Sequence, residues 1–316
     1  MKLFLIRHGE TVDNIAGLYA GSRDSALTNH GVEQTKRLGA YFAEESIKLT
    51  HIFASPLTRA FMTAEAVLAK KKHDGTLEIV KVDALKERDF GRFEGKPYTS
   101  DEKSEGNDKK RKTGCELGGI ETAASLAKRS DAFIDDFLLP LFATDGLEDE
   151  YIVAVVAHGM LLSHMWRRLL PRLPRKSLTI AAEVTASKGN VILEHLGGWS
   201  NTGYLELSFS QSGKGDVHVV GEAKLESEGD TATLPTIAPP VPEGEEPAVA
   251  AAEQSSPAKA SAASPKLEGW STTIVAVDSK QHLVGLKRQR GGIGSLAHDA
   301  GQKKLDGFFS KRQKTS

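Results

Sequence analysis

The chain has 316 residues, of which 39% are hydrophobic and 26% are charged, and its formal net charge is -1 at pH 7. This balance excludes a protein that is basic along its whole length, and no apolar run approaches the roughly 20 residues that a membrane span needs, so we expect a soluble protein without membrane contact. The single cysteine, Cys115, excludes an intrachain disulfide and is typical of a reducing compartment.

Short apolar runs alternate with segments of helical spacing through the first half of the chain. Four runs of aliphatic and β-branched residues predict strands: 3–6, 51–55, 77–82 and 151–157. Four segments predict helices: one capped by Thr28, one starting at Pro56, 121–137 and 160–170. Near-continuous apolar strands that alternate with helices predict an α/β fold with a mostly parallel central sheet and helices on both faces.

The composition changes between about Glu222 and Glu268, where the chain is rich in Ala, Pro, Glu and Ser. Nine acidic and three basic residues give this stretch a local charge of -6. Because it holds almost no large apolar residue, it cannot bury enough surface to fold. We therefore predict that 223–268 is disordered.

This acidic segment has two interpretations. It is either a flexible linker after a complete domain, 1–222, or a long insertion before a strand that closes the domain. The second is favoured because 270–278 alternates like a strand, and an isolated strand is not stable alone. Its expected partner is 204–210 or 217–221.

The end of the chain reverses the charge. From Gly285 to Ser316, eight basic and two acidic residues give +6, so the near-zero total is a cancellation. A basic tail over 284–316 is either a solvated end or a surface for nucleic acid or a nuclear import receptor. Direct nucleic-acid binding stays open, and we expect a nuclear or cytoplasmic location, or both.

Residues suited to phosphate chemistry follow the predicted strands: Arg7, His8, Arg59, Glu87 and His158. Each alone has an ordinary explanation, such as a surface histidine, a solvated helix face or a charge run. The carboxyl ends of parallel strands meet at one edge of a sheet, which is where ligands bind in such folds. Their convergence therefore predicts a site that handles phosphate.

Four motifs hold these residues in a fixed order: LIRHGETVDN at 5–14, SPLTRAFMTA at 55–64, LKERDFGRFEGK at 85–96 and VVAHG at 155–159. Together they resemble the histidine phosphatase superfamily, also called the phosphoglycerate mutase-like family, over about 1–210. The third motif is similar to the fructose-2,6-bisphosphatase-like branch. The resemblance implies a metal-independent phosphomonoesterase that uses no cofactor and acts on a small phosphorylated metabolite, such as a sugar phosphate.

The resemblance also implies roles for the residues. His8 is then the nucleophile that becomes phosphohistidine, and Glu87 is the proton donor. Arg7, Arg59 and His158 hold the phosphoryl group. This agrees with elementary chemistry, because two guanidiniums neutralise and orient a phosphate dianion so that a neutral imidazole can attack it.

Two further residues match the family pattern, and one segment departs from it. Asn14 is implied as another phosphate contact, and the backbone around Gly21 lines the substrate side. Phosphoglycerate mutases of the family carry an Arg-rich, Pro-rich segment where this chain has the hydrophilic stretch 98–119, which favours a phosphatase. The bases at 109–112 either contact a second anionic group or, as we favour, form a solvated lid loop.

A second motif, QKKLDGFF, occupies 302–309 in the basic tail. Adjacent phenylalanines in a polar tail need a partner to bury them, and tight 3₁₀ spacing gathers the apolar side chains into one plug. The motif resembles the PCNA-interacting-peptide box, which docks on the sliding clamp of DNA replication. Its anchor positions are Gln302, Leu305, Phe308 and Phe309. The alternative is that both rings pack back on the phosphatase domain.

Two other functions stay open. The domain is alternatively a catalytically weak phosphate-binding or scaffold protein whose main role is clamp binding, or a phosphoglycerate mutase. The intact set of predicted catalytic residues favours an active hydrolase. No Asp or His cluster at metal-ligand spacing is evident in the sequence.

Overall fold

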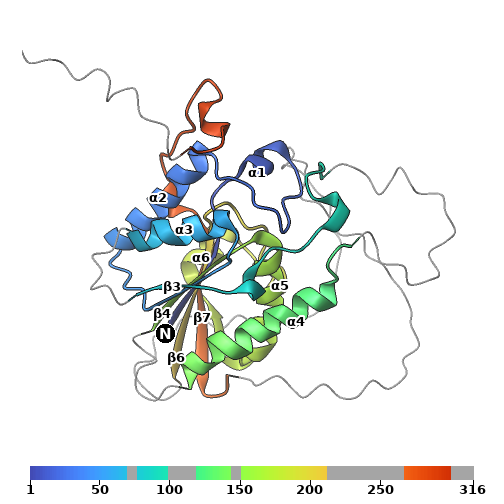
Figure 1. Cartoon of the computed structure of the whole chain (residues 1–316). Helices are drawn as coiled ribbons and strands as arrows, with labels where there is room; N and C mark the ends of the chain where they lie inside the picture. The colour runs from blue at the N-terminus through green and yellow to red at the C-terminus, as the bar shows by residue number, and fades with distance from the viewer. Residues whose placement is uncertain (70–76, 99–118, 144–150, 212–266, 300–316) are drawn as a thin grey trace, which may run out of the picture.

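The computed structural model describes residues 1–69, 77–98, 119–143, 151–211 and 267–299 (Figure 1). Within them, one seven-stranded sheet runs in the order β3-β2-β4-β1-β6-β7-β5. Its strands are β1 (Lys2–Arg7), β2 (His51–Ala54), β3 (Ile79–Lys81), β4 (Ile152–Ala157), β5 (Leu178–Ile180), β6 (Tyr204–Gln211) and β7 (Trp270–Ser279). Only β6 runs antiparallel to its neighbours β1 and β7. The predicted α/β fold with a mostly parallel sheet is confirmed.

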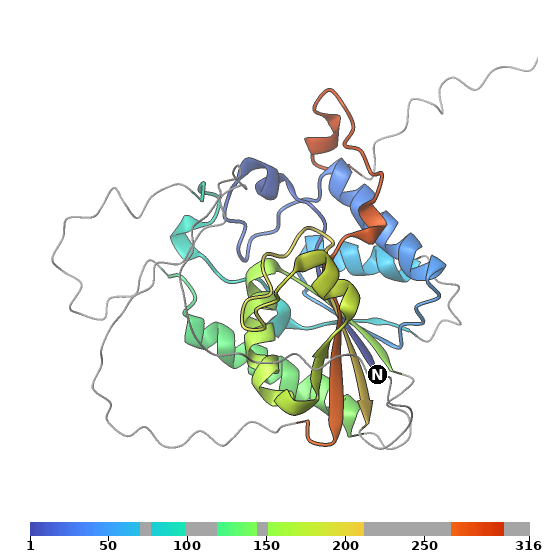
Figure 2. The ribbon, with the colours of Figure 1, turned by 180° about the vertical axis from the view of Figure 1, so that it is seen from behind.

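Helices cover both faces of this sheet. They are α1 (Val12–Ala16), α2 (Asn29–Glu44), α3 (Thr58–Ala69), α4 (Ala123–Phe133), α5 (Gly159–Leu169) and α6 (Ala182–Lys188). Figures 1 and 2 show α2 and α3 on one side of the sheet, with α4, α5 and α6 on the other. None of the helices in the described residues is long and apolar enough to cross a membrane.

The middle of strand β1 is apolar because both faces of the strand are covered by helices. Leu3 and Leu5 belong to the cluster that packs on α4 and α5, whereas Phe4 and Ile6 belong to the cluster that packs on α2 and α3. Side chains alternate across a strand, so a strand covered on both faces buries every residue. β4 alternates in the same way, as expected for the neighbouring strands β4 and β1 in the interior of the sheet.

The helix predicted over 121–137 is regular for only part of that range. α4 ends at Phe133 and continues as a π-helical turn, Ile134–Leu138. Pro140 follows in a 3₁₀ turn, and it has no N–H to extend the helical ladder. The regular helix therefore stops before the predicted boundary.

The strand β7 completes the sheet late in the sequence. It pairs with β6 in antiparallel register, with Leu207 opposite Ile274 and Phe209 opposite Thr272. Of the two partners expected for the predicted strand 270–278, 204–210 is therefore the one that pairs with it. On its other edge β7 pairs with β5. The other candidate partner, 217–221, and nearly all of the acidic segment 223–268 lie outside the described residues.

The chain after β7 packs along α2 (Figures 1 and 2, red). The backbone N–H of Asn29 donates to the carbonyl of Leu296, at 3.0 Å. Arg288 binds the Glu10 carboxylate with both terminal nitrogens, at 2.8 Å for Nη1 to Oε1, a geometry that favours the guanidinium fork. The first part of the predicted basic tail, up to Asp299, therefore lies against the domain beside the motif at 5–14.

Because β7 lies between two strands, a cavity in it will destabilise the whole domain. Ile274 is fully buried, and replacing it with alanine is expected to lower the free energy of unfolding by about 2 to 5 kcal/mol. Urea denaturation followed by circular dichroism measures this. Val284→Ala, at a position that is 72% exposed, is the matched control. An unchanged midpoint for Ile274→Ala would mean that β7 contributes nothing to folding.

Candidate active site

The predicted site residues begin at the carboxyl edge of β1, β2 and β4. The backbone N–H of His8 donates to the carbonyl of Ala157, and that of Ser55 donates to the carbonyl of Val156, both at 3.0 Å. These bonds continue the parallel ladders past the strand ends and place His8 beside His158. The two imidazole rings lie 5.0 Å apart between centroids, and both side chains are buried.

The tautomer of His8 is fixed by its neighbour in sequence. Its Nδ1 lies 2.7 Å from the carbonyl oxygen of Gly9, and a carbonyl can only accept a hydrogen bond. Nδ1 therefore carries the proton, so Nε2 keeps its lone pair when the ring is neutral. Gly9 is itself held by the hydroxyl of Thr63, at 3.0 Å from its N–H. Nε2 is therefore the ring nitrogen whose lone pair can accept a proton or bond to an electrophile.

Two guanidiniums flank this imidazole. Arg59 is 1% exposed and donates through Nη1 to the carbonyl of Arg23 and through Nη2 to that of Gly21, both at 2.7 Å. Arg7 donates to the carbonyl of Trp199. The Nε atoms of both arginines are buried and have no partner among the described residues. The charge of Glu87 favours both guanidiniums, but their two buried Nε donors have no partner among the described residues, which makes this pocket suited to an anion.

Burial, with help from the local charges, lowers the pKa of both histidines and so favours their neutral forms. Burial lowers the pKa of His8 well below its usual value, and the nearby charges of Arg59 and then Arg7 lower it further. Burial also lowers the pKa of His158 well below its usual value, with smaller effects from Arg59 and His8. Neutral His8 is the form that can attack phosphorus.

Only one of the two ring nitrogens of His158 has a hydrogen-bond partner among the described residues. Its Nε2 lies 2.8 Å from the hydroxyl of Ser55, and its Nδ1 is buried without a partner among the described residues. Ser55 itself is fully buried. The sequence indicates only that Ser55 ends the predicted strand 51–55, because its contact with His158 depends on the pairing of β2 with β4.

Glu87 lies at the amino end of α5. Its Oε1 accepts from the N–H of Arg88 at 2.9 Å and from that of Leu161 at 3.1 Å, whereas its Oε2 has one longer contact, 3.3 Å from the N–H of Met160. The free N–H groups of a helix start hold carboxylates in this way. Oε2 is therefore the oxygen with capacity left to carry a proton.

The two predicted substrate contacts have different roles in the structure. Asn14 accepts through Oδ1 from the side chain of Asn201 at 3.1 Å, and it hydrogen bonds to Tyr98. Since Asn201 also donates to the carbonyl of His8 at 3.2 Å, one side chain connects Asn14 to the backbone of His8. Gly21 contributes its carbonyl to Arg59, and its φ of 56° is one that a side chain disfavours.

The loop before β6, which contains Ser200 and Thr202, holds the backbone of Arg7 and His8 in place. The backbone N–H of Thr202 is shared between the carbonyls of Arg7 and His8, at 3.1 and 3.2 Å. The hydroxyl of Thr202 lies 2.9 Å from Nε2 of His282. Asp278, at the end of β7, accepts from the N–H and hydroxyl of Ser200, both at 2.8 Å. Asp278 and His282 therefore stabilise the loop that in turn binds the backbone of Arg7 and His8.

Burial of His282 makes this contribution to stability sensitive to acid. Burial lowers the pKa of His282 to about 4, compared with about 6.5 in an unfolded chain. Between these values the unfolded chain binds a proton that the folded chain does not, so stability falls as pH falls, by about 1.4 kcal/mol per pH unit. The stability advantage of the wild type over His282→Gln is expected to shrink from about pH 6.5 downward, measured by urea denaturation.

Gln281→Ala, an exposed neighbour that does not titrate, is the control for this pH dependence. It should differ from the wild type by the same amount at each pH. A constant difference between wild type and His282→Gln over the same range would contradict the assigned burial effect.

Two predicted features lie outside the described residues: the basic run 109–112, and the clamp-binding anchors Gln302, Leu305, Phe308 and Phe309. In the part of the chain that the structure describes, no group of three or more His, Cys, Asp or Glu side chains is placed to hold a metal ion. The charged side chains that act most strongly on His8 are Arg59 and Arg7, and guanidinium donors suit an anion.

A model of the histidine phosphatase superfamily (branch 1) matches residues 3–192. The chain belongs to this superfamily. The matched range contains every predicted catalytic residue from Arg7 to His158. The strands β6 and β7 and the segment packed on α2 lie beyond it, so part of what braces the histidine phosphatase site comes from outside the family match.

Relatives with curated descriptions match parts of the chain. A probable phosphatase of Schizosaccharomyces pombe is 32% identical over 169 residues, which are 53% of this chain and 56% of that protein. A probable fructose-2,6-bisphosphatase of Danio rerio, TIGAR A, is 38% identical over 94 residues, which are 29% of this chain and 36% of that protein. The chain thus spans about half or less of the length of these relatives.

Solved structures also resemble this chain. A mycobacterial glucosyl-3-phosphoglycerate phosphatase is 22% identical, with a TM-score of 0.49, and the match covers 65% of this chain and 89% of that one.

Proposed function

We propose that this chain is a phosphoric monoester hydrolase that acts through phosphohistidine at His8. The observation that carries the proposal is the environment of His8: Nδ1 is fixed by the carbonyl of Gly9, and the guanidiniums of buried Arg59 and half-buried Arg7 lie beside the ring. Membership of the histidine phosphatase superfamily supports it. A neutral nucleophile beside two guanidiniums fits attack on a phosphate dianion.

The first half of the reaction forms the covalent intermediate. Nε2 of His8 bonds to phosphorus while the bond from phosphorus to the ester oxygen breaks. Glu87 gives a proton to the departing oxygen, which leaves as an alcohol. Arg7 and Arg59 offset the charge of the phosphoryl oxygens, and Nδ1 of His158 adds a donor.

The second half regenerates the enzyme. Water attacks phosphorus, the bond to Nε2 of His8 breaks, and Glu87 takes the proton of the attacking water. Inorganic phosphate leaves, and His8 returns to its neutral form. Every proton released in one half is consumed in the other, so no co-reactant besides water is needed.

The proposed substrate is a small phosphorylated metabolite, such as a sugar phosphate. The test is phosphate release from 4-nitrophenyl phosphate and from a panel of sugar phosphates, phosphoglycerates and nucleotides. Saturable release is expected for at least one metabolite. Interconversion of phosphoglycerates without release would instead favour a mutase, and no turnover of any phosphoester would favour a phosphate-binding scaffold.

A second proposal concerns the tail. We propose that 302–309 attaches the phosphatase to the sliding clamp of DNA replication, on the basis of the four matched anchor positions. His298 donates its N–H to the carbonyl of Leu27 at 2.8 Å, so the motif follows closely on a segment fixed to the domain. This proposal places the protein in the nucleus for at least part of its life.

Titration of the full chain against purified PCNA tests the attachment. Phe308→Ala combined with Phe309→Ala is expected to abolish binding while phosphate release stays unchanged. Lys311→Ala is a control in the same tail. Equal affinity of the wild type and the double variant would overturn the docking mode.

A further inference from the structure

The segment that carries Glu87 has little regular structure to hold it. It follows a 3₁₀ turn, Asp83–Leu85, and precedes another, Gly91–Phe93. A general acid must reach the leaving oxygen within hydrogen-bonding distance. Contacts from elsewhere in the fold therefore have to fix the backbone around Glu87.

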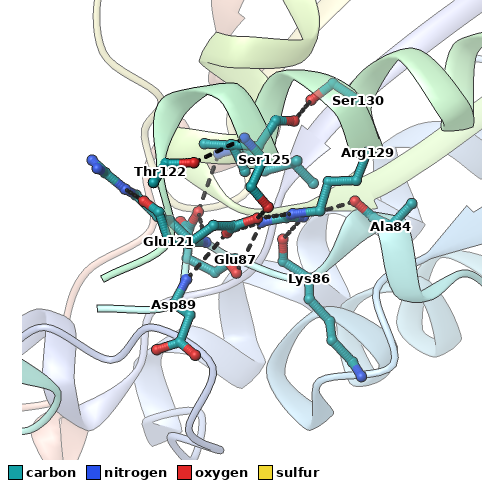
Figure 3. A network of polar contacts seen from close by, with 12 residues as sticks. Ala84, Lys86, Glu87, Asp89, Glu121, Thr122, Ser125, Arg129 and Ser130 are labelled. Atoms are coloured by element: carbon teal, nitrogen blue, oxygen red, sulfur yellow. Dashed lines mark hydrogen bonds and ion pairs between the residues drawn. The ribbon is translucent and has the colours of Figure 1, made fainter. Parts of the chain in front are cut away.

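Arg129 of α4 supplies most of these contacts (Figure 3). Its Nη1 donates to the carbonyls of Ala84 and Lys86, at 2.8 and 2.5 Å, and its Nη2 donates to the carbonyl of Glu87 at 3.1 Å. The remaining two donors go to Glu121: Nε to Oε1 at 2.7 Å and Nη2 to Oε2 at 2.8 Å. All five N–H donors of the guanidinium are used, which a lysine cannot reproduce.

Glu121 extends the same network to the other side of Glu87. Its Oε2 accepts from the N–H of Asp89 at 3.3 Å, and its own N–H donates to the carbonyl of Asp89 at 2.8 Å. Its carbonyl accepts from Nε of Arg88 at 2.9 Å. Glu87 therefore lies between a residue bound by Arg129 and residues bound by Glu121 (Figure 3).

The ion pair is sheltered, because the side chains of Arg129 and Glu121 are 20% and 13% exposed. Although burial alone raises the pKa of Glu121, hydrogen bonding and charge from Arg129 lower it overall. The carboxylate thus stays ionised and bound to the guanidinium across the neutral pH range.

We propose that Arg129 and Glu121 are positioning residues that hold Glu87 where it can protonate the leaving group. This inference rests on the proposed function, because it needs Glu87 to be the proton donor. Neither residue donates the proton itself. Their loss should therefore impair the step in which the leaving oxygen is protonated and spare the binding of phosphate.

Substrates with different leaving groups separate these effects. Phenyl phosphate needs a proton on its leaving oxygen far more than 4-nitrophenyl phosphate does, because phenolate is the stronger base. Arg129→Lys is expected to lower kcat/KM for phenyl phosphate by about tenfold and kcat/KM for 4-nitrophenyl phosphate by less than about twofold, because kcat/KM reports only the half-reaction in which the leaving oxygen departs. Inhibition by inorganic phosphate should be unchanged, because the binding of phosphate is spared.

Two further variants keep the test sharp. Glu121→Gln removes the charge and replaces one of the two oxygens that accept from Arg129 by an NH2 group. Arg129 keeps its contacts with the Ala84, Lys86 and Glu87 carbonyls, so a smaller selective loss, about threefold, is expected. Arg168→Gln is the control, since Arg168 forms an ion pair with Asp131 of α4 at 2.6 Å that does not involve the Glu87 segment. It should lower stability without selecting between the substrates. Each assay is run below the variant's unfolding midpoint.

Glu87→Gln distinguishes failure of this inference from failure of the mechanism. A selective loss on phenyl phosphate in Glu87→Gln, with no further loss when Arg129→Lys is added, supports positioning. If Glu87→Gln is selective and Arg129→Lys lowers both rates equally, the positioning role is overturned. If Glu87→Gln itself shows no selectivity, Glu87 is not the proton donor and the proposed function fails at that step.

Discussion

His8→Ala is expected to lower kcat/KM for 4-nitrophenyl phosphate by at least about 10³-fold, as removal of the nucleophile does in other covalent catalysts. The reason is geometric: Nε2 of His8 is the atom left free by the contact of Nδ1 with Gly9. The neighbouring buried imidazole, His158, holds Ser55 through Nε2, and in the proposed mechanism its Nδ1 carries a proton, so it does not replace His8 as the nucleophile. Initial rates over a range of substrate concentrations measure the loss.

Trapping of the phosphohistidine intermediate tests directly whether His8 is the nucleophile. Wild-type protein mixed with labelled substrate and quenched in alkali should retain phosphate on histidine, because the P–N bond is stable in alkali and labile in acid. His8→Ala should retain none, whereas His195→Ala, on an exposed surface, should label like the wild type. Full labelling of His8→Ala would show that another residue is the nucleophile.

The core of the site could be predicted from sequence because its residues follow readable strands. The apolar runs that form β1 and β4 are buried on both faces and stand out from their surroundings. His8 and His158 come directly after them, so the parallel pairing of these strands brings the two together. Arg59 depends in the same way on β2.

The supporting residues could not be predicted, since their roles depend on contacts between distant parts of the chain. Asn201 donates to the carbonyl of His8 across 193 residues, from a loop with no periodicity. Arg129 is one of several charges on α4, and only the tertiary position of the Glu87 segment distinguishes it from a solvated side chain. The strand β5 was missed because it has three residues, none of them fully buried.

Tail residues show a related limit of charge patterns. Arg288 belongs to a basic tail that the sequence predicts to be a solvated end or a binding surface. In the structure it is bound to Glu10, two residues after the nucleophile. Net charge describes how a segment interacts at long range, but it does not reveal a specific acidic partner inside the fold.

Arg59 is the residue whose replacement should alter binding, catalysis and stability together. Arg59→Met removes a buried cation and leaves the carbonyls of Gly21 and Arg23 without their donor. Loss of one such electrostatic contact typically costs about 10²- to 10³-fold in rate, and each unpaired buried carbonyl costs about 1 to 3 kcal/mol. Arg59→Lys should recover only part of the rate, because an ammonium cannot reach both carbonyls and the phosphoryl oxygens at once.

The pH profile of Arg59→Met identifies the charge effect. After burial, Arg59 is the largest cause of the lowered pKa of His8, so its removal raises that pKa. Because His8 must be neutral to attack, the acidic limb of kcat/KM should move to higher pH in Arg59→Met and less in Arg59→Lys. Arg37→Met, on the exposed face of α2, should leave the limb in place. An unshifted limb in Arg59→Met, in a variant that remains folded by circular dichroism, would mean that the charge of Arg59 does not act on His8.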